Sequence, residues 1–141
     1  MKKPLIVMLV VFVLATLCLI PSVKSEVIAA TTNNFTARIV STAAGNAMSV
    51  YAADVDGDGD MDLMSASQGD DKIAWYENDG ASPPSWTART VSTAADSAQS
   101  VYAADVDGDG DIDLMSASAN DNKIAWYEND GASPPSWTAR T

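Results

Sequence analysis

The chain has no histidine, and its single cysteine, Cys18, lies in an apolar run near the N-terminus. Without these residue types it lacks the imidazole and thiolate ligands of zinc and copper sites, as well as a cysteine–histidine nucleophile pair. A nucleophile elbow and a glycine-rich phosphate loop are also absent. With one cysteine, the fold must be held together by packing or by bound metal, and not by internal disulfides.

Positive charge is scarce as well. Eight Lys and Arg stand against 19 Asp and Glu, which gives a formal net charge of −11. A surface this acidic disfavours nucleic acid and anionic membranes as partners. Sustained helical periodicity is missing after residue 25, and the Ala-rich stretch at residues 42–48 is too short for more than a marginal helix. These absences favour an all-β fold.

The N-terminus has the pattern of a secretory signal peptide. Lys2 and Lys3 precede an apolar run over residues 5–20, followed by a proline and small residues. Cleavage is expected after Ser25, or four or five residues later, which leaves 26–34 as a linker and changes the net charge to −11 − 3 = −14. A secreted or cell-surface protein without membrane insertion is therefore predicted. A retained anchor is the alternative, although the apolar run is short for a membrane span.

Two acidic loops dominate the rest of the chain. Five aspartates alternate with other residues over nine positions, and at neutral pH their mutual repulsion disfavours a compact loop unless a cation neutralises it. All the candidate ligands are hard oxygens, which favours Ca²⁺ over Mg²⁺, and Gly59 permits the turn around an ion. The alternative is an acidic, solvated turn without an ion. The candidate ligands are Asp54, Asp56, Asp58, Asp60 and Asp62 in the first loop and Asp105, Asp107, Asp109, Asp111 and Asp113 in the second.

These loops are not EF-hands. An EF-hand needs a bidentate glutamate at position twelve of the loop, and here that position holds Ser65 or Ser116. The loop is expected to close at position nine, with Asp60 and Asp111 offering their backbone carbonyls. Two structural calcium sites are predicted, one per loop.

The chain contains an internal repeat. A shift of 51 residues aligns 35–90 with 86–141, and nine of the 56 aligned positions differ. A period of this length is typical of propellers and arrays, in which each repeat is one supersecondary unit. Within the repeat, short apolar segments at residues 49–53, 63–67, 72–76 and 86–91 are separated by the acidic loop, a turn at 69–71 and a proline-containing loop.

The four segments predict four antiparallel strands, which is the blade of a β-propeller. Trp75 and Trp86 are expected to pack between neighbouring blades. Two blades do not close a ring, so the sequence is interpreted as a fragment of a longer protein or as a unit that assembles with others, the fragment being favoured. The predicted segments are a leading strand and connection at 35–49, blade one at 50–91, a connection at 92–100 and blade two at 101–141.

The motif Asp-x-Asp-x-Asp-Gly-x-x-Asp-Leu, flanked by Val-Tyr-Ala-Ala and Lys-Ile-Ala-Trp-Tyr-Glu-Asn, resembles the FG-GAP/VCBS repeats of the integrin α-chain head and of exported bacterial proteins. The resemblance implies a propeller whose acidic loop joins the first two strands of each blade and binds Ca²⁺. It implies side-chain ligation by Asp54, Asp56, Asp58 and Asp62, with Asp60 as a main-chain ligand, and the same roles 51 residues later. The Phe-Gly and Gly-Ala-Pro signatures of that family are absent.

The sequence thus predicts an exported, calcium-binding, non-enzymatic propeller module that presents a surface for adhesion to a protein or carbohydrate ligand. The expected partners also include further repeats or copies of itself. Two alternatives remain: a non-catalytic appendage of a larger secreted enzyme, such as a carbohydrate-active one, and a structural surface array.

Overall fold

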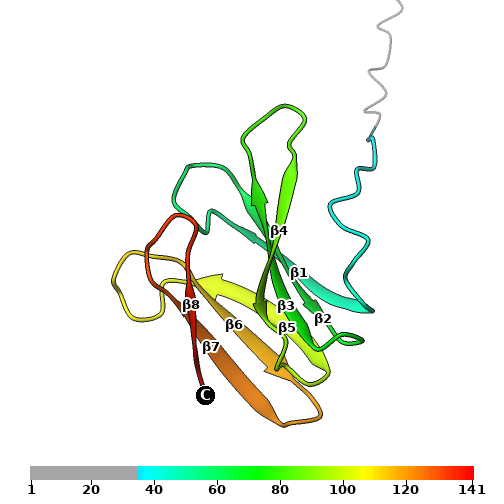
Figure 1. Ribbon diagram of the computed structural model, residues 1–141, viewed down its shortest axis with the longest axis vertical. Helices are drawn as coiled ribbons and strands as arrows, with labels where there is room; N and C mark the ends of the chain where they lie inside the picture. Colours follow the sequence, from blue (N-terminus) through cyan, green and yellow to red (C-terminus); the bar gives the residue numbers. More distant parts are fainter. Residues whose placement is uncertain (1–34) are drawn as a thin grey trace, which may run out of the picture. The chain divides into compact units, whose positions relative to one another are not determined.

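Eight β-strands make up the described part of the protein, residues 35–141 of a computed structural model (Figure 1). The signal peptide and linker expected at 1–34 lie outside the described residues. Ala37–Thr141 forms one compact unit. Among the described residues, no helix has the length and apolar character needed to cross a membrane. The strands are β1 (Ala47–Ala53), β2 (Asp62–Ser67), β3 (Lys72–Asn78), β4 (Trp86–Ser92), β5 (Ala98–Ala104), β6 (Asp113–Ser118), β7 (Lys123–Asn129) and β8 (Trp137–Arg140).

The strands form two antiparallel meanders, β1-β2-β3-β4 (blade 1) and β5-β6-β7-β8 (blade 2). Each strand pairs with the next one along the chain, as short hairpin connections require. In both blades the turn between the second and third strands contains a residue of positive φ, Asp71 at 54° and Asn122 at 53°. Asp and Asn tolerate this conformation better than most residues. The predicted all-β fold of four-stranded blades is confirmed.

The predicted leading strand at residues 35–40 is wrong, because the structure has no strand there. By the repeat these residues correspond to most of β4, which pairs with β3 of its own blade. No strand precedes β1 among the described residues, so 35–40 has no neighbour to form a ladder with. Blade 1 begins at Ala47 and not at residue 50 as expected, and blade 2 begins at Ala98 and not at residue 101.

The hydrophobic core lies between the two blades. One face of blade 1 contributes side chains that are fully buried, including those of Met64, Ile73 and Trp75. Trp75 and Trp137, the repeat equivalent of Trp86, make a T-shaped contact with a centroid distance of 6.5 Å. Tryptophan packing between neighbouring blades therefore agrees with the sequence.

Blade 2 covers this core with its opposite face. Its buried residues Val101, Leu114 and Tyr127 are the repeat equivalents of Val50, Leu63 and Tyr76. Since side chains alternate across a strand, these lie on the other side of the sheet from the equivalents of Ile73 and Trp75. The blades are thus stacked head to tail, as successive blades of a propeller are, and not as a symmetric pair.

Polar contacts fix the register between the blades. The Ser97 backbone N–H donates to the Asp71 carboxylate at 2.8 Å, and the Gln68 amide donates to the Ser97 hydroxyl at 2.9 Å. The Tyr51 and Tyr102 rings lie with their centroids 4.5 Å apart. The first two contacts join the turn between β2 and β3 to the start of blade 2, and the tyrosine pair joins β1 to β5.

Candidate metal centre

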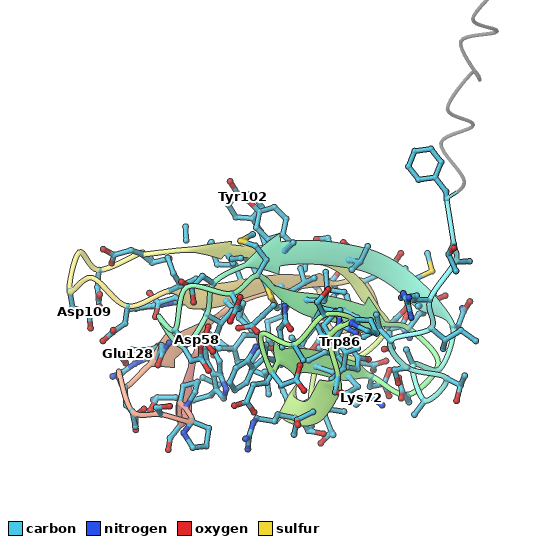
Figure 2. All side chains as sticks on the ribbon, turned by 90° about the horizontal axis from the view of Figure 1, so that it is seen from above. Asp58, Lys72, Trp86, Tyr102, Asp109 and Glu128 are labelled. Atoms are coloured by element: carbon cyan, nitrogen blue, oxygen red, sulfur yellow. The ribbon has the colours of Figure 1, made fainter. Side chains whose placement is uncertain are left out.

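Both acidic loops join the first two strands of a blade: residues 54–61 between β1 and β2, and residues 105–112 between β5 and β6. The loops lie toward the same end of the unit, as Asp58 and Asp109 show in Figure 2, whereas Lys72 lies toward the other end. Gly57 and Gly59 have φ angles of 73° and 96°, and the second loop repeats both values closely. Side-chain-bearing residues rarely adopt this conformation, so these glycines let the backbone curl around the loop interior.

The first three aspartates of each loop converge. One carboxylate oxygen from each of Asp54, Asp56 and Asp58 lies within 4.8 Å of the other two, and the same holds in the second loop. Backbone N–H groups of the loop orient them: Gly59 donates to Asp54 at 3.0 Å, and Asp60 donates to Asp58 at 2.8 Å. The fold therefore gathers three negative charges around one point, with no basic side chain among the bonds that hold them.

One carboxylate oxygen in the first loop has no partner. Asp54 Oδ1 is buried, and no donor among the described residues reaches it. In the second loop the equivalent oxygen of Asp105 accepts a hydrogen bond from the Gly108 N–H at 2.7 Å. Burying a charged oxygen without a partner is costly. A cation in the cluster would remove this cost, and three hard oxygen ligands suit Ca²⁺, so the residues present fit the ion that the sequence predicts.

The electrostatics agree with this fit. Burial raises the pKa of Asp56, and the nearby carboxylates of Asp58 and Asp62 raise it further. Burial likewise raises the pKa of Asp107, with additional repulsion from acidic neighbours that include Glu128. The fully ionised cluster is thus disfavoured by itself, and a bound cation would stabilise the ionised form.

Asp62 lies outside the three-carboxylate cluster. It is fully buried; its Oδ2 accepts from the Val55 N–H at 3.1 Å and its Oδ1 from the Asn78 N–H at 2.8 Å. Burial raises the pKa of Asp62, and these two N–H groups oppose that effect. Asp113 makes the same pair of bonds in blade 2. Asp62 thus ties the start of the loop to the end of β3, and ligation by its remaining lone pairs stays a prediction.

Asp60 contacts the segment that follows β3. Its carboxylate lies directly against Gly80, in the turn that follows β3, and Asp111 meets Gly131 in the same way. Asn78 adds a hydrogen bond from its side-chain amide to the Met61 carbonyl at 3.0 Å. The segment after β3 therefore forms a wall of the acidic loop.

Sequence reasoning missed this wall. The segment Glu-Asn-Asp-Gly is identical in the two repeats, which was an available signal. However, it lies 16 residues or more beyond the loop residues it contacts, so only the pairing of β2 with β3 brings the two together.

The comparison with protein families supports the repeat interpretation. The model of the FG-GAP-like repeat matches the chain twice, at residues 27–65 and 54–116. The two matches together span 27–116, which is well over half of the 141 residues. No curated protein and no solved structure matches the chain. With two consecutive four-stranded blades and an acidic loop at the same place in each, the chain belongs to the FG-GAP-like repeat family.

Proposed function

We propose that this β-propeller-like module binds two Ca²⁺ ions, one in each acidic loop, and that the ions stabilise the fold. The observation that carries the proposal is the convergence of Asp54, Asp56 and Asp58 around a buried carboxylate oxygen that lacks a donor. The proposed ligands in the first loop are these three side chains, the Asp62 carboxylate and the Asp60 carbonyl. Their equivalents 51 residues later bind the second ion.

An ion in the first loop would stabilise the contact between the two blades as well as the loop, because this loop contacts blade 2. The Val55 carbonyl in this loop accepts a hydrogen bond from the Asn129 amide of blade 2 at 3.2 Å, and the Val55 side chain is part of the core between the blades. Fixing the loop therefore fixes an edge of the interface between the blades. A role in folding fits this arrangement better than a role in catalysis, because the same residues recur in each blade.

We also propose that the module is exported and non-enzymatic, and that it presents a binding or adhesion surface to an extracellular protein or carbohydrate. The support for export is the pattern of the first 25 residues. FG-GAP-like repeats are typically non-catalytic, which supports a binding role. N-terminal sequencing of the exported protein should find Glu26, or one of the next five residues, as the first residue. A chain that still begins at Met1 would contradict export by cleavage.

Isothermal titration calorimetry of the exported chain tests the metal proposal. Ca²⁺ should bind at two sites with weak affinity, roughly 10⁻⁴–10⁻³ M, as in other extracellular modules, and Mg²⁺ should bind more weakly. Asp56→Asn and Asp107→Asn form a matched pair, since each removes one charge from one loop, and each should reduce the stoichiometry from two to one. Circular dichroism verifies that both variants remain folded. Absence of calcium heat, or equal heats with Mg²⁺, would reject the proposal.

A further inference from the structure

The interface between the blades uses two different faces of the repeat, and within the described residues 35–141 each face occurs a second time without a blade against it. The ridge face is defined here by four residues of blade 1 that are all fully buried against blade 2, namely Met64, Ala66, Ile73 and Trp75. The groove face is defined by the blade 2 residues that cover them, namely Val101, Leu114, Ser116 and Tyr127. Because the repeat sequences coincide at all these positions, blade 2 carries a second ridge face and blade 1 a second groove face.

The second ridge face is open. It consists of Met115, Ala117, Ile124 and Trp126. Ile124 is 74% exposed, whereas its equivalent Ile73 is 0% exposed. Tyr102, beside this face, is 52% exposed and points away from the unit in Figure 2. The residues that form the protein core in blade 1 are therefore only partly buried in blade 2, and Ile124 is exposed.

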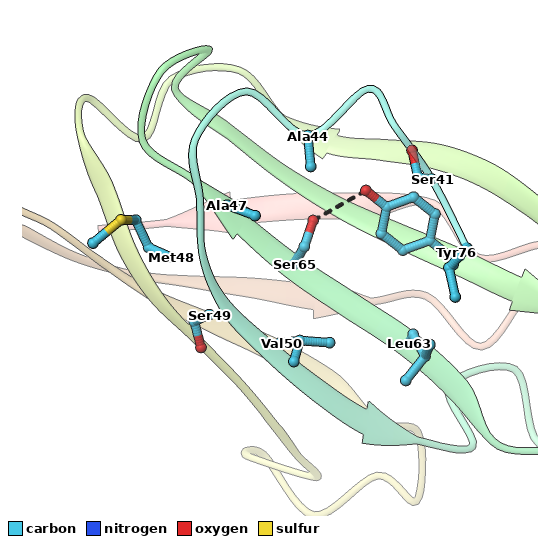
Figure 3. A pocket seen from close by; sticks show the side chains of 10 residues that line it. Ser41, Ala44, Ala47, Met48, Ser49, Val50, Leu63, Ser65 and Tyr76 are labelled. Carbon is cyan, nitrogen blue, oxygen red and sulfur yellow. Dashed lines mark hydrogen bonds between the residues drawn. The ribbon is translucent and has the colours of Figure 1, made fainter. Parts of the chain in front are cut away.

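The second groove face is also uncovered by the part of the chain that the structure describes, and it is hollowed. A groove of about 320 Å³ lies on blade 1, and its lining includes Val40, Ala44, Val50, Leu63 and Tyr76 (Figure 3). Val50 is 67% exposed. The repeat equivalents of these five residues all belong to the core between the blades or pack against it, namely Val91, Ala95, Val101, Leu114 and Tyr127. The groove thus has the lining of a position that a ridge face fills.

A side-chain hydrogen bond between the blades is likewise present at one copy of the repeat and missing at the other. Asn129 uses both hydrogens of its side-chain amide, one on the Ile112 carbonyl and one on the Val55 carbonyl of the neighbouring blade. Its equivalent Asn78 donates to the Met61 carbonyl, the counterpart of Ile112, and makes no second bond of this kind among the described residues. The matching acceptor is the carbonyl of Val106, whose side chain is 45% exposed while that of Val55 is 2% exposed.

We propose that the ridge face of one copy of this chain docks into the groove face of a second copy. The contact repeats the packing already present between blades 1 and 2. Trp126 of one copy meets Trp86 of the next as Trp75 meets Trp137, and Asn78 donates to the carbonyl of Val106. A partner without this repeat would have to reproduce this complementarity, whereas a second copy carries it already.

The contact joins two unlike faces, so every added copy presents a free face again until a ring closes. Propellers have four to eight blades, which corresponds to rings of about two to four copies. The contact between copies is weaker than the one within the chain, because Ala119 replaces Gln68 and cannot make the amide bond that Gln68 makes to Ser97. Dissociation at high dilution is therefore expected.

Analytical ultracentrifugation of the exported chain, without the apolar N-terminal run at residues 5–20, in the presence of millimolar Ca²⁺, tests the proposal. The wild type should associate in a concentration-dependent way. Val50→Asp blocks the groove and Ile124→Asp blocks the ridge, and each should weaken association by about 100-fold, since a charge is then buried at the centre of the contact. An equimolar mixture of the two variants should form a 1:1 dimer and nothing larger, because the intact ridge of one fits the intact groove of the other.

Ala132→Glu is the matched control, because Ala132 and its equivalent Ala81 are both exposed although blade 2 covers blade 1. This variant should associate like the wild type. A monomeric wild type, association that persists in both blocked variants, or a mixture that stays monomeric would each overturn the proposal. Neither blocked residue lies in an acidic loop, and Ca²⁺ binding is measured separately by calorimetry, so this test is independent of the metal proposal.

Discussion

Gly80 and Gly131 stand where a Cβ would meet the carboxylate of an aspartate. Gly80 has a φ of 67°, and the Asp60 carboxylate lies against the position that a Cβ would occupy. Gly57 has a similar φ of 73° but nothing within 4 Å of that position. Substitutions at Gly80 and Gly57 therefore distinguish the cost of a steric contact from the cost of backbone strain alone.

We predict that Gly80→Ala lowers the free energy of unfolding more than Gly57→Ala, by about 1 kcal/mol or more, because both variants strain the backbone but the first also displaces Asp60. Urea unfolding of both variants, in chelator so that metal binding does not contribute, measures the difference. Equal losses would show that Asp60 moves away without cost.

Asp58 and Asp60 differ in what their side chains do. Asp58 belongs to the converging cluster, whereas the Asp60 carboxylate faces Gly80 and its proposed ligand is the backbone carbonyl. We predict that Asp58→Ala removes most Ca²⁺ binding at the first loop and that Asp60→Ala retains most of it. Calorimetry on the two variants decides this, and comparable losses would show that the main-chain assignment of Asp60 is wrong.

The loop between β3 and β4 closes on a single carboxylate. Asp79 Oδ1 accepts from the Ser85 N–H at 2.8 Å and from the Ala81 N–H at 3.1 Å. These bonds lower the pKa of Asp79 below its ordinary value of 3.8, the Ser85 bond contributing most. Asp130 is held in the same way in blade 2.

A lowered carboxylate pKa in the folded state means that the unfolded state binds the proton more tightly. The contribution of Asp79 is therefore present above pH 3.8 and is lost as the pH falls through its lower folded value. We predict that Asp79→Asn destabilises the protein at neutral pH and that the difference from wild type shrinks below pH 3.8. Thermal melts across this range measure it, with Asp130→Asn as the matched variant. A difference that grows in acid would contradict the assignment.

Strands β3 and β7 have the same sequence and different surroundings. Ile73 in β3 is fully buried, and Ile124 in β7 is 74% exposed. We predict that Ile73→Ala costs about 2–5 kcal/mol of unfolding free energy and that Ile124→Ala changes it by less than about 0.5 kcal/mol. Chemical denaturation in a Val50→Asp background, where the groove is blocked, keeps the comparison to single chains. Similar costs at the two positions would contradict the stacking of the blades.

The described unit combines an acidic surface with two loops that gather like charges, so its stability should depend on cations. We predict that Ca²⁺ raises the melting temperature, Mg²⁺ raises it less, and chelator reverses the gain. An ion that binds only the folded state at 100 times its dissociation constant adds about 2.7 kcal/mol per site, which is large beside the total stability of a typical domain. Scanning calorimetry at several Ca²⁺ concentrations measures this. A melting temperature indifferent to chelator would reject a structural role for the ion.

Much of the architecture was predictable because its determinants are local. The repeat, the four strands of each blade and the turns between them follow from alternating apolar segments and from Gly, Asp and Asn at the turns. The cluster of Asp54, Asp56 and Asp58 was predictable for the same reason, since its members and the glycines that bend the loop lie within six residues of one another.

What the sequence alone could not determine is which copy of each residue is buried. Ile73 and Ile124, or Val55 and Val106, have the same neighbours along the chain, and only the blade beside them distinguishes core from surface. The leading strand failed for this reason, as 35–40 has the sequence of a strand but no neighbouring strand among the described residues. Hydrogen-bond ladders and apolar burial both require a partner surface, and in two nearly identical repeats that partner is decided by tertiary structure.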